Sequence, residues 1–208
     1  MENQASRKLI KVILLGDSGV GKSSLIARYV DEAYKPYIGS TVSPDFAVKE
    51  VQIKEDTICV CQIWDTAGQE RFFSLCTSYF RGADAVGLVF DLTNTTASTF
   101  EKITKWRQTF FDIVAVDPER FTMVLIGNKN DCARPNTSVF KEANDKARAW
   151  LAVNKNVEYV TCSAKTGEDV VDAFAKLAIA GYNFSNSTSV SEETPLKKTE
   201  AKSEGCCN

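Results

Sequence analysis

The sequence contains no histidine among its 208 residues. Without histidine the chain cannot carry a histidine-based catalytic triad, a histidine-ligated zinc ion or a histidine general base. It also lacks a run of about 18 apolar residues that would span a membrane, and its polar N-terminal residues 1–8 do not resemble a signal peptide. Any catalysis must therefore rely on carboxylates, amides, lysine, arginine, the backbone or a metal ion.

A marked excess of charge of either sign is also missing. The net charge of −2, with no basic stripe, gives no reason to expect a nucleic acid partner. The seven cysteines do not form a disulfide framework: Cys59 and Cys61 alternate on one face of an apolar strand, where buried free thiols are the simplest interpretation. We therefore expect a protein of a reducing, cytoplasmic compartment.

The most informative stretch runs from Gly16 to Ser23 and reads G-D-S-G-V-G-K-S. This is the pattern of a phosphate-binding loop, in which glycines let successive N–H groups turn toward an anion. Lys22 would bring positive charge to the β- and γ-phosphates, and Ser23 would offer a hydroxyl to Mg²⁺. An apolar run (9–15) and a plausible helix (24–30) flank the loop, which makes a simple connecting turn the weaker interpretation. The predicted nucleotide-binding residues here are Asp17, Ser18, Gly19, Val20, Gly21, Lys22, Ser23 and Ser24.

Strand-like and helix-like segments alternate along the rest of the chain. Predicted strands cover 46–53, 57–64, 85–91, 122–126 and 157–161, and amphipathic helices cover 100–113, 140–151 and 170–178. This order predicts an α/β fold: a doubly wound, six-stranded, mostly parallel sheet of the P-loop NTPase type, with one antiparallel edge hairpin strand and helices on both faces. We expect the domain to cover 1–182 and the polar residues 183–208 to form a disordered tail. Ser98 with Glu101 suggests a capping box at one helix start.

Polar residues follow the strand 57–64, at the edge where such sheets bind ligands. Asp65 fits the role of holding Mg²⁺ through water, downstream of a phosphate-binding loop. Gly68 can bring its N–H close to a γ-phosphate, and Gln69 can orient an attacking water. These residues indicate hydrolysis of a nucleoside triphosphate.

A second polar group follows the strand 122–126 and reads Asn128-Lys129-Asn130-Asp131. A carboxylate accepts hydrogen bonds from N1–H and the N2 amine of guanine but repels the ring acceptor of adenine. Asp131 is therefore the predicted base discriminator, with Asn128 and Lys129 supporting the pocket. The last predicted strand is followed by further base-site candidates, namely Ser163, Ala164, whose N–H would meet guanine O6, and Lys165, whose stem would cover the base.

These segments together resemble the small GTPases of the Ras superfamily over roughly residues 8–182. The run W-D-T-A-G-Q-E-R-F (64–72), the run Y-F-R-G-A (79–83) and the adjacent Cys206 and Cys207 resemble the Rab family. The segments R-G-A-D (81–84) and D-P-E-R-F (117–121) are similar to the late-endosomal Rab-seven branch.

The resemblance implies several roles that the residues alone do not fix. Thr41 would bind Mg²⁺ and the γ-phosphate, and would form with Gly68 a switch that GTP holds and hydrolysis releases. Tyr34 would pack against guanine. Catalysis would depend on Gln69 and Lys22, at a slow intrinsic rate on the order of 10⁻⁴ to 10⁻² s⁻¹ unless a partner supplies an arginine. Effector proteins would dock on three exposed aromatic residues, Phe46, Trp64 and Tyr79.

The resemblance also implies where and with what the protein works. Cys206 and Cys207 would both carry geranylgeranyl groups, and two such chains give stable membrane anchoring. The implied setting is the cytoplasmic face of endomembranes, in particular the late endosome or lysosome, with a soluble cytosolic pool. A monomer would work with effectors, an exchange factor, a GTPase-activating protein, a GDP-dissociation inhibitor and an escort protein.

Two positions depart from the usual family pattern. Ile38 stands where many relatives have a tyrosine, and Pro44, which lacks a backbone donor, stands in the approach to the strand 46–53. These departures leave effector choice and loop dynamics open, and neither involves a predicted nucleotide ligand. The alternatives to a GTPase switch are a guanine-nucleotide-binding scaffold with negligible hydrolysis and a metabolic P-loop ATPase or kinase, which Asp131 argues against.

Overall fold

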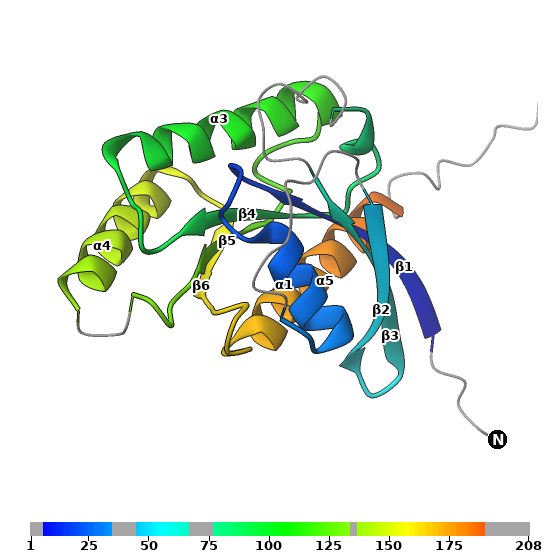
Figure 1. Ribbon diagram of the computed structural model, residues 1–208. Coiled ribbons are helices and arrows are strands. Elements are labelled where there is room, and N and C mark those ends of the chain that lie inside the picture. The colour runs from blue at the N-terminus through cyan, green and yellow to red at the C-terminus, as the bar shows by residue number, and fades with distance from the viewer. Residues whose placement is uncertain (1–5, 35–44, 67–76, 134–136, 190–208) are drawn as a thin grey trace, which may run out of the picture.

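The computed structural model describes residues 6–34, 45–66, 77–133 and 137–189 (Figure 1). The elements in chain order are β1 (Ser6–Leu15), α1 (Lys22–Asp31), β2 (Asp45–Lys54), β3 (Thr57–Asp65), the 3₁₀ turn η2 (Thr77–Tyr79), β4 (Ala85–Asp91), α3 (Ala97–Val114), β5 (Met123–Asn128), α4 (Ser138–Val153), β6 (Val157–Thr161) and α5 (Val170–Ser189).

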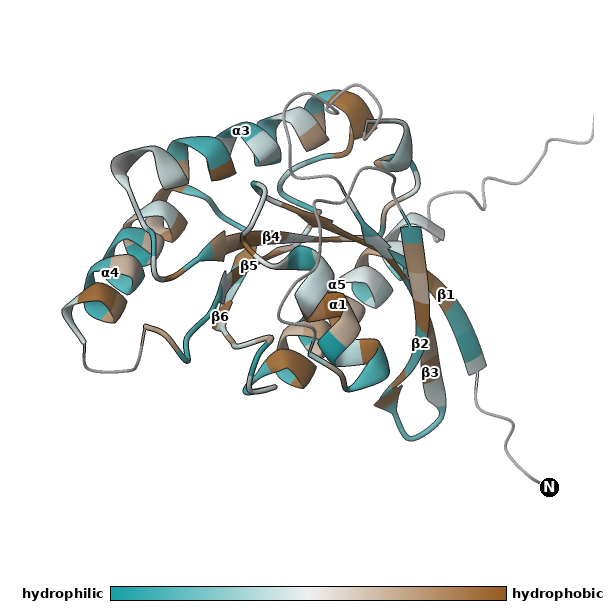
Figure 2. Cartoon of the chain, in the orientation of Figure 1, coloured by the Kyte–Doolittle hydropathy of each residue, from teal (hydrophilic) through white to brown (hydrophobic). Residues whose placement is uncertain are grey.

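The strands form one six-stranded sheet in the order β2-β3-β1-β4-β5-β6. All neighbours pair in parallel except β2 and β3, which form the antiparallel hairpin at one edge. The predicted sheet is therefore confirmed. The central strands β4 and β5 are nearly continuous apolar runs because both of their faces are covered, and this hydrophobic centre is visible in Figure 2. The edge strand β2 instead alternates between exposed and partly buried residues.

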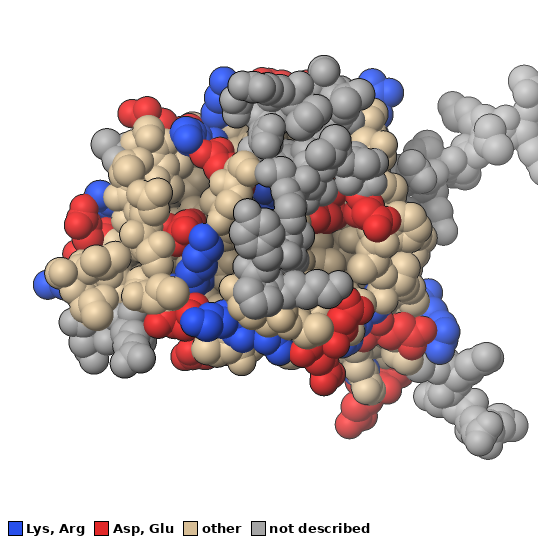
Figure 3. All heavy atoms as spheres, in the orientation of Figure 1, with Lys and Arg blue, Asp and Glu red and all other residues tan. Residues whose placement is uncertain are grey.

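Helices cover both faces of the sheet (Figure 1). The helices α1 and α5 pack on one face, where Tyr29 stacks on Phe174 with ring centroids 4.1 Å apart. The helices α3 and α4 pack on the other face, where Phe110 and Trp150 are buried. On the molecular face in Figure 3, acidic and basic side chains of the described residues are interspersed, in keeping with the small net charge.

Two helix boundaries, the start of α3 and the end of α5, differ from the sequence-based expectation in ways that tertiary or capping contacts explain. The helix α3 starts earlier than expected, with Thr96 as its N-cap, and the reciprocal capping box joins Thr96 and Thr99 rather than Ser98 and Glu101. The backbone N–H of Thr96 donates to Thr99 Oγ1 at 3.0 Å. The hydroxyl of Thr99 thus supplies the acceptor that was expected from Glu101, two residues later.

The helix α5 also continues to Ser189, past the expected domain end at residue 182. Tertiary contacts explain the extension. The ring of Phe184 packs edge-on against Phe121, with centroids 4.7 Å apart, and Lys8 Nζ donates to Asn186 Oδ1 at 2.7 Å. Residues 183–189 are therefore part of α5 in this structure, and the boundary between the domain and a disordered tail stays a prediction.

The parallel strands β1, β3, β4, β5 and β6 all end at the same edge of the sheet. The residues at these ends include Asp65, Asp91 and Asn128, and the loop 16–21 follows β1 there. Because ligands of doubly wound sheets bind beyond the carboxyl ends of the strands, the fold gathers the candidate residues at this edge.

Candidate functional site

The loop between β1 and α1 is built around backbone conformations that only glycine adopts easily. Gly16, Gly19 and Gly21 have φ angles of 147°, 80° and 100°. A Cβ atom at Gly16 would lie 2.3 Å from the carbonyl oxygen of Val89, and one at Gly21 would lie 2.3 Å from Asn128 Nδ2. The loop therefore lies directly against β4 and the end of β5, and its shape depends on these glycines.

Lys22 is the first residue of α1 and is only 5% exposed. Its ammonium group donates to the carbonyl oxygens of Gly16 and Asp17 at 2.8 and 3.0 Å, so the loop curls around its own lysine. The first turn of α1, which also contains Ser23 and Ser24, has no acidic residue. The helix N-terminus and Lys22 therefore both present positive potential to the loop, which suits a phosphate group.

Asn128, at the end of β5, joins three segments of the site. Its side-chain Nδ2 donates to Val20 O at 2.8 Å, and its Oδ1 accepts from the backbone N–H of Ala164 at 3.1 Å. Asn128 is 1% exposed, so both bonds are shielded from water. The N–H of Ala164 that was expected to meet guanine O6 is thus engaged with Asn128 in this structure, and its contact with a base stays a prediction.

Lys129 also reaches the phosphate-binding loop. Its φ angle of 69° is in the left-handed region, and its Nζ donates to Gly19 O at 2.8 Å and pairs with Asp91 Oδ2 at 2.6 Å. The two residues predicted to support the base pocket, Asn128 and Lys129, therefore both bind the loop that follows β1.

Asp131 lies among groups that hold it in the ionised form. Burial alone would raise the pKa of this carboxyl, but hydrogen bonds from Ser163 and Cys132 and the nearby charge of Lys165 hold its pKa below the ordinary value. Ser163 Oγ donates to Asp131 Oδ1 at 2.7 Å, and Lys165 Nζ lies 3.7 Å from Oδ2. The structure thus brings together the predicted base-site residues from two loops, with a carboxylate acceptor at neutral pH.

Ser23 and Asp65 provide oxygen ligands of the kind that Mg²⁺ prefers. Asp65 pairs in register with Leu14, so it lies beside the strand that leads into the phosphate-binding loop, and one of its carboxylate oxygens is shielded from solvent. The described residues contain no cluster of three His, Cys, Asp or Glu side chains suited to a metal. Mg²⁺ usually takes one or two protein ligands and completes its shell with water and phosphate oxygens, so Ser23 and Asp65 fit this ion.

Residues 11–182 match the Ras family. The chain is a member of the Ras family. The protein is 47% identical to Ras-related protein RABG3e of Arabidopsis thaliana over 81% of the chain and 80% of the relative. It is 46% identical to Ras-related protein Rab7 of Pisum sativum over 83% of the chain and 82% of that relative. It is 38% identical to Ras-related protein Rab-7a of Paramecium octaurelia over 97% of the chain and 98% of the relative.

This Ras-family protein is a Rab-type small GTPase, a GTP/GDP switch of vesicle trafficking with a Rab7-like sequence. Members of the family in general bind GTP or GDP with Mg²⁺ and work with regulators and effectors. In the part of the chain that the structure describes, we find no helix with the length and apolar character that a membrane crossing requires. Neither the family match nor the relatives favour a scaffold with negligible hydrolysis.

The structure of the GTPase also places the three predicted effector-contact residues in one cluster. Phe46 and Trp64 are direct cross-strand neighbours on β2 and β3, with ring centroids 4.9 Å apart, and Trp64 lies 5.3 Å from Tyr79. Phe46 is 48% exposed, and Lys11 Nζ lies 4.9 Å from the ring of Trp64. Aromatic residues that are packed together yet partly exposed suit a protein-binding surface.

Several predicted residues lie at or beyond the limits of the described structure. Tyr34 follows α1 and is 37% exposed. The predicted switch, catalytic and lipidation residues, and the two departures from the family pattern, lie outside the described residues: Thr41, Gly68, Gln69, Cys206, Cys207, Ile38 and Pro44.

The sequence reasoning missed two groups of contacts that shape the site of this GTPase. Arg28 of α1 donates from Nε to Ala164 O at 2.9 Å and from Nη2 to Lys165 O at 2.8 Å, and so holds the base-site loop. On the other side of the phosphate-binding loop, Lys102 and Trp106 of α3 contact Asp17. Such contacts join distant parts of the chain and have no local sequence signal.

Proposed function

We propose that the loop 16–23 binds the phosphates of GTP or GDP and that the segments 128–131 and 163–165 bind guanine. The observation that carries this proposal is the position of Asn128, which contacts Val20 of the phosphate loop and Ala164 of the base loop with one amide. A nucleotide that spans both segments would therefore occupy a site whose two halves are already joined. Asp131 supplies the acceptor that distinguishes guanine from adenine.

Hydrolysis in this proposal depends on Gln69, which orients the attacking water, and on Lys22, which stabilises charge on the phosphate oxygens. Ser23, Thr41 and Asp65 would hold Mg²⁺, which when bound neutralises charge on the β- and γ-phosphates. The intrinsic rate is slow, on the order of 10⁻⁴ to 10⁻² s⁻¹, and an arginine from a GTPase-activating protein accelerates it.

The switch acts through partners and a membrane. GTP holds Thr41 and Gly68 near the γ-phosphate, and effectors then dock on Phe46, Trp64 and Tyr79. Geranylgeranyl groups on Cys206 and Cys207 anchor the protein to the cytoplasmic face of late-endosomal or lysosomal membranes, which the Rab7 names of its relatives support. An exchange factor, an escort protein and a GDP-dissociation inhibitor complete the cycle.

Single-turnover hydrolysis of bound GTP tests the enzymatic part of this proposal. We expect Gln69→Leu to hydrolyse GTP more slowly than the wild type and to resist stimulation by a Rab GTPase-activating protein. Gln108→Leu is the matched control because Gln108 lies on the exposed side of α3, where it contacts Asp112. Equal stimulated rates in Gln69→Leu and the wild type would remove Gln69 from the mechanism.

A further inference from the structure

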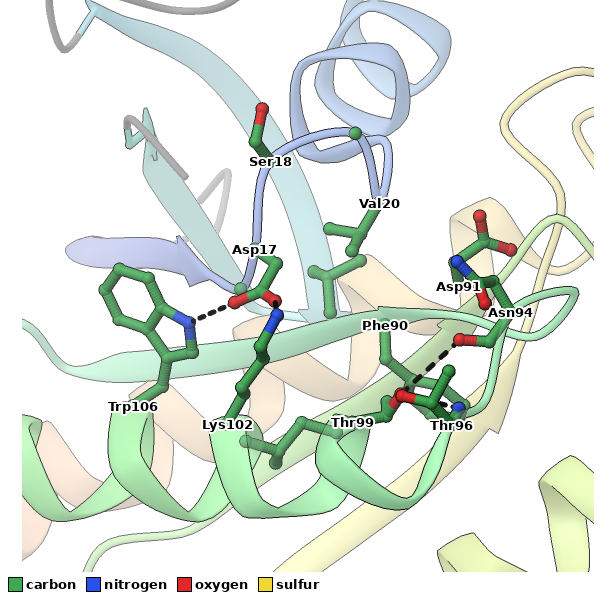
Figure 4. A pocket seen from close by; sticks show the side chains of 14 residues that line it. Asp17, Ser18, Val20, Phe90, Asp91, Asn94, Thr96, Thr99, Lys102 and Trp106 are labelled. Carbon is green, nitrogen blue, oxygen red and sulfur yellow. Dashed lines mark hydrogen bonds and ion pairs between the residues drawn. The ribbon is translucent and has the colours of Figure 1, made fainter. Parts of the chain in front are cut away.

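The side chain of Asp17 leaves the phosphate-binding loop and turns toward α3 (Figure 4). Its Oδ2 pairs with Lys102 Nζ at 2.7 Å, and its Oδ1 accepts from Trp106 Nε1 at 3.2 Å. Lys102 and Trp106 are spaced as residues i and i+4, so they lie on the same face of the helix. Both carboxylate oxygens of Asp17 are therefore engaged by one face of α3.

The backbone of Asp17 contacts Lys22 on the inner side of the loop. Its carbonyl oxygen accepts from Lys22 Nζ at 3.0 Å, next to the bond from the same ammonium group to Gly16 O at 2.8 Å. A shift of Asp17 would thus move a group that orients Lys22. The side chain of Asp17 thus contacts α3, while its backbone carbonyl oxygen accepts a hydrogen bond from Lys22.

The negative charge of Asp17 is unfavourable for phosphate binding by the loop. A carboxylate in a phosphate-binding loop repels the phosphates, and it also offers Lys22 a competing partner. Lys102 neutralises this carboxylate and keeps it on the side of the loop that faces α3. A cavity of about 300 Å³ is lined by residues of both the loop and α3, and the side chains of Asp17 and Lys102 are 36% and 57% exposed. Because water reaches the pair, its effect should be a few-fold rather than many orders of magnitude.

We propose that Lys102 is a positioning residue for nucleotide retention: it neutralises Asp17 and keeps this carboxylate turned toward α3 and away from the phosphates, while the indole N–H of Trp106 fixes the carboxylate. This inference rests on the placement of the phosphates in the loop 16–23 proposed above. If the ion pair only stabilised the loop, loss of Lys102, of Asp17 or of both would loosen the loop equally, and all three variants would release nucleotide at the same raised rate.

The rate of GDP release from the full-length protein tests this inference. The protein is loaded with fluorescent GDP and Mg²⁺, and release is followed in excess unlabelled GDP. We expect Lys102→Gln to release GDP roughly two- to five-fold faster than the wild type, because it leaves an unneutralised carboxylate in the loop. Asp17→Asn, which leaves the positive charge of Lys102 beside the loop, should release GDP more slowly. The double variant, which lacks the carboxylate as well as the lysine, should release GDP more slowly than Lys102→Gln. Lys102→Arg keeps the positive charge and should also release GDP more slowly than Lys102→Gln.

Lys105→Gln is the matched control because Lys105 is an exposed lysine on the same helix. The acceleration in Lys102→Gln should also shrink as salt rises, since the repulsion is screened. Release from Lys102→Gln at the rate of Lys105→Gln, or release from the double variant as fast as from Lys102→Gln, would overturn the inference. A wild-type protein that fails to bind GDP would instead refute the proposed nucleotide site itself.

Discussion

The side-chain amide of Asn128 donates to the carbonyl oxygen of Val20 at 2.8 Å and so fastens the end of β5 to the phosphate-binding loop. The same amide accepts a hydrogen bond from the N–H of Ala164. The segments that we propose for base binding and for phosphate binding are therefore one hydrogen-bonded unit, and disturbing one segment should affect the other.

Replacement of Asn128 tests this coupling. Asn128→Ala would leave the carbonyl of Val20 and the N–H of Ala164 buried without their partner, which should lower the free energy of unfolding by about 1–3 kcal/mol. It should also accelerate nucleotide release. Chemical denaturation and GDP release would be measured beside Asn154→Ala, whose amide only caps α4 through Trp150 O. Nucleotide release as slow as in that control would show that the link has no role in binding.

In the proposed site, the identity of the bound base depends on Asp131. Asp131→Asn replaces an acceptor by an amide that can donate to the 2-oxo group of xanthine, so we expect preference to move from GDP toward XDP. Competition between the two nucleotides for the purified protein measures the ratio. Asp145→Asn, a change on the exposed face of α4, should keep the preference for GDP. An unchanged preference in Asp131→Asn would refute the base assignment.

The four cysteines that the structure describes should be alkylated at different rates because they differ in burial. Burial raises the pKa of the Cys61 and Cys162 thiols to about 12, and it also raises the pKa of Cys59. Cys132 is exposed, although its hydrogen bond to Asp131 raises its pKa as well. At pH 8 the native protein should therefore be alkylated at Cys132 well before the three buried thiols, because thiolate and access are both required.

Peptide mass spectrometry after brief treatment with iodoacetamide would measure these four rates. In urea the rates should become similar, which is the control for intrinsic reactivity. Native labelling of Cys61 or Cys162 as fast as Cys132 would contradict the buried positions that the structure assigns to them.

The extension of α5 should contribute to stability. Phe184→Ala removes the aromatic contact with Phe121 and should lower the free energy of unfolding by about 1–2 kcal/mol, because the ring is only partly buried. Val171→Ala, at a 69% exposed position of the same helix, is the control. An unchanged unfolding curve for Phe184→Ala would favour the disordered tail expected from the composition of residues 183–189.

The sheet and the nucleotide motifs were predictable because their signals are local. Gly16, Lys22 and Asp131 lie in short runs that follow apolar strands, and parallel strand ends must meet at one edge. The start of α3 was misplaced because several hydroxyl residues between Thr96 and Thr99 can cap a helix, and the sequence alone does not select one. The end of α5 was misplaced because the residues around Phe184 are polar, and the sequence gives no signal for the packing of Phe184 against Phe121.

The contacts of Asp17 with α3 and of Arg28 with the base loop were not predictable. Each joins residues that are far apart in the sequence, and each depends on how two elements pack rather than on their composition. In the sequence, Asp17 is an ordinary residue of a phosphate-binding loop, and only the structure shows that Lys102 Nζ lies 2.7 Å from its Oδ2.

The nucleotide that accompanies the purified protein tests the central claim most directly. Freshly purified protein, kept in magnesium throughout, would be heat-denatured and its released nucleotide identified by ion-exchange chromatography. We predict one equivalent of GDP per chain, since the guanine pocket, the phosphate-binding loop and slow hydrolysis together lead to that state. An adenine nucleotide, or no nucleotide, would contradict the assignment of the site.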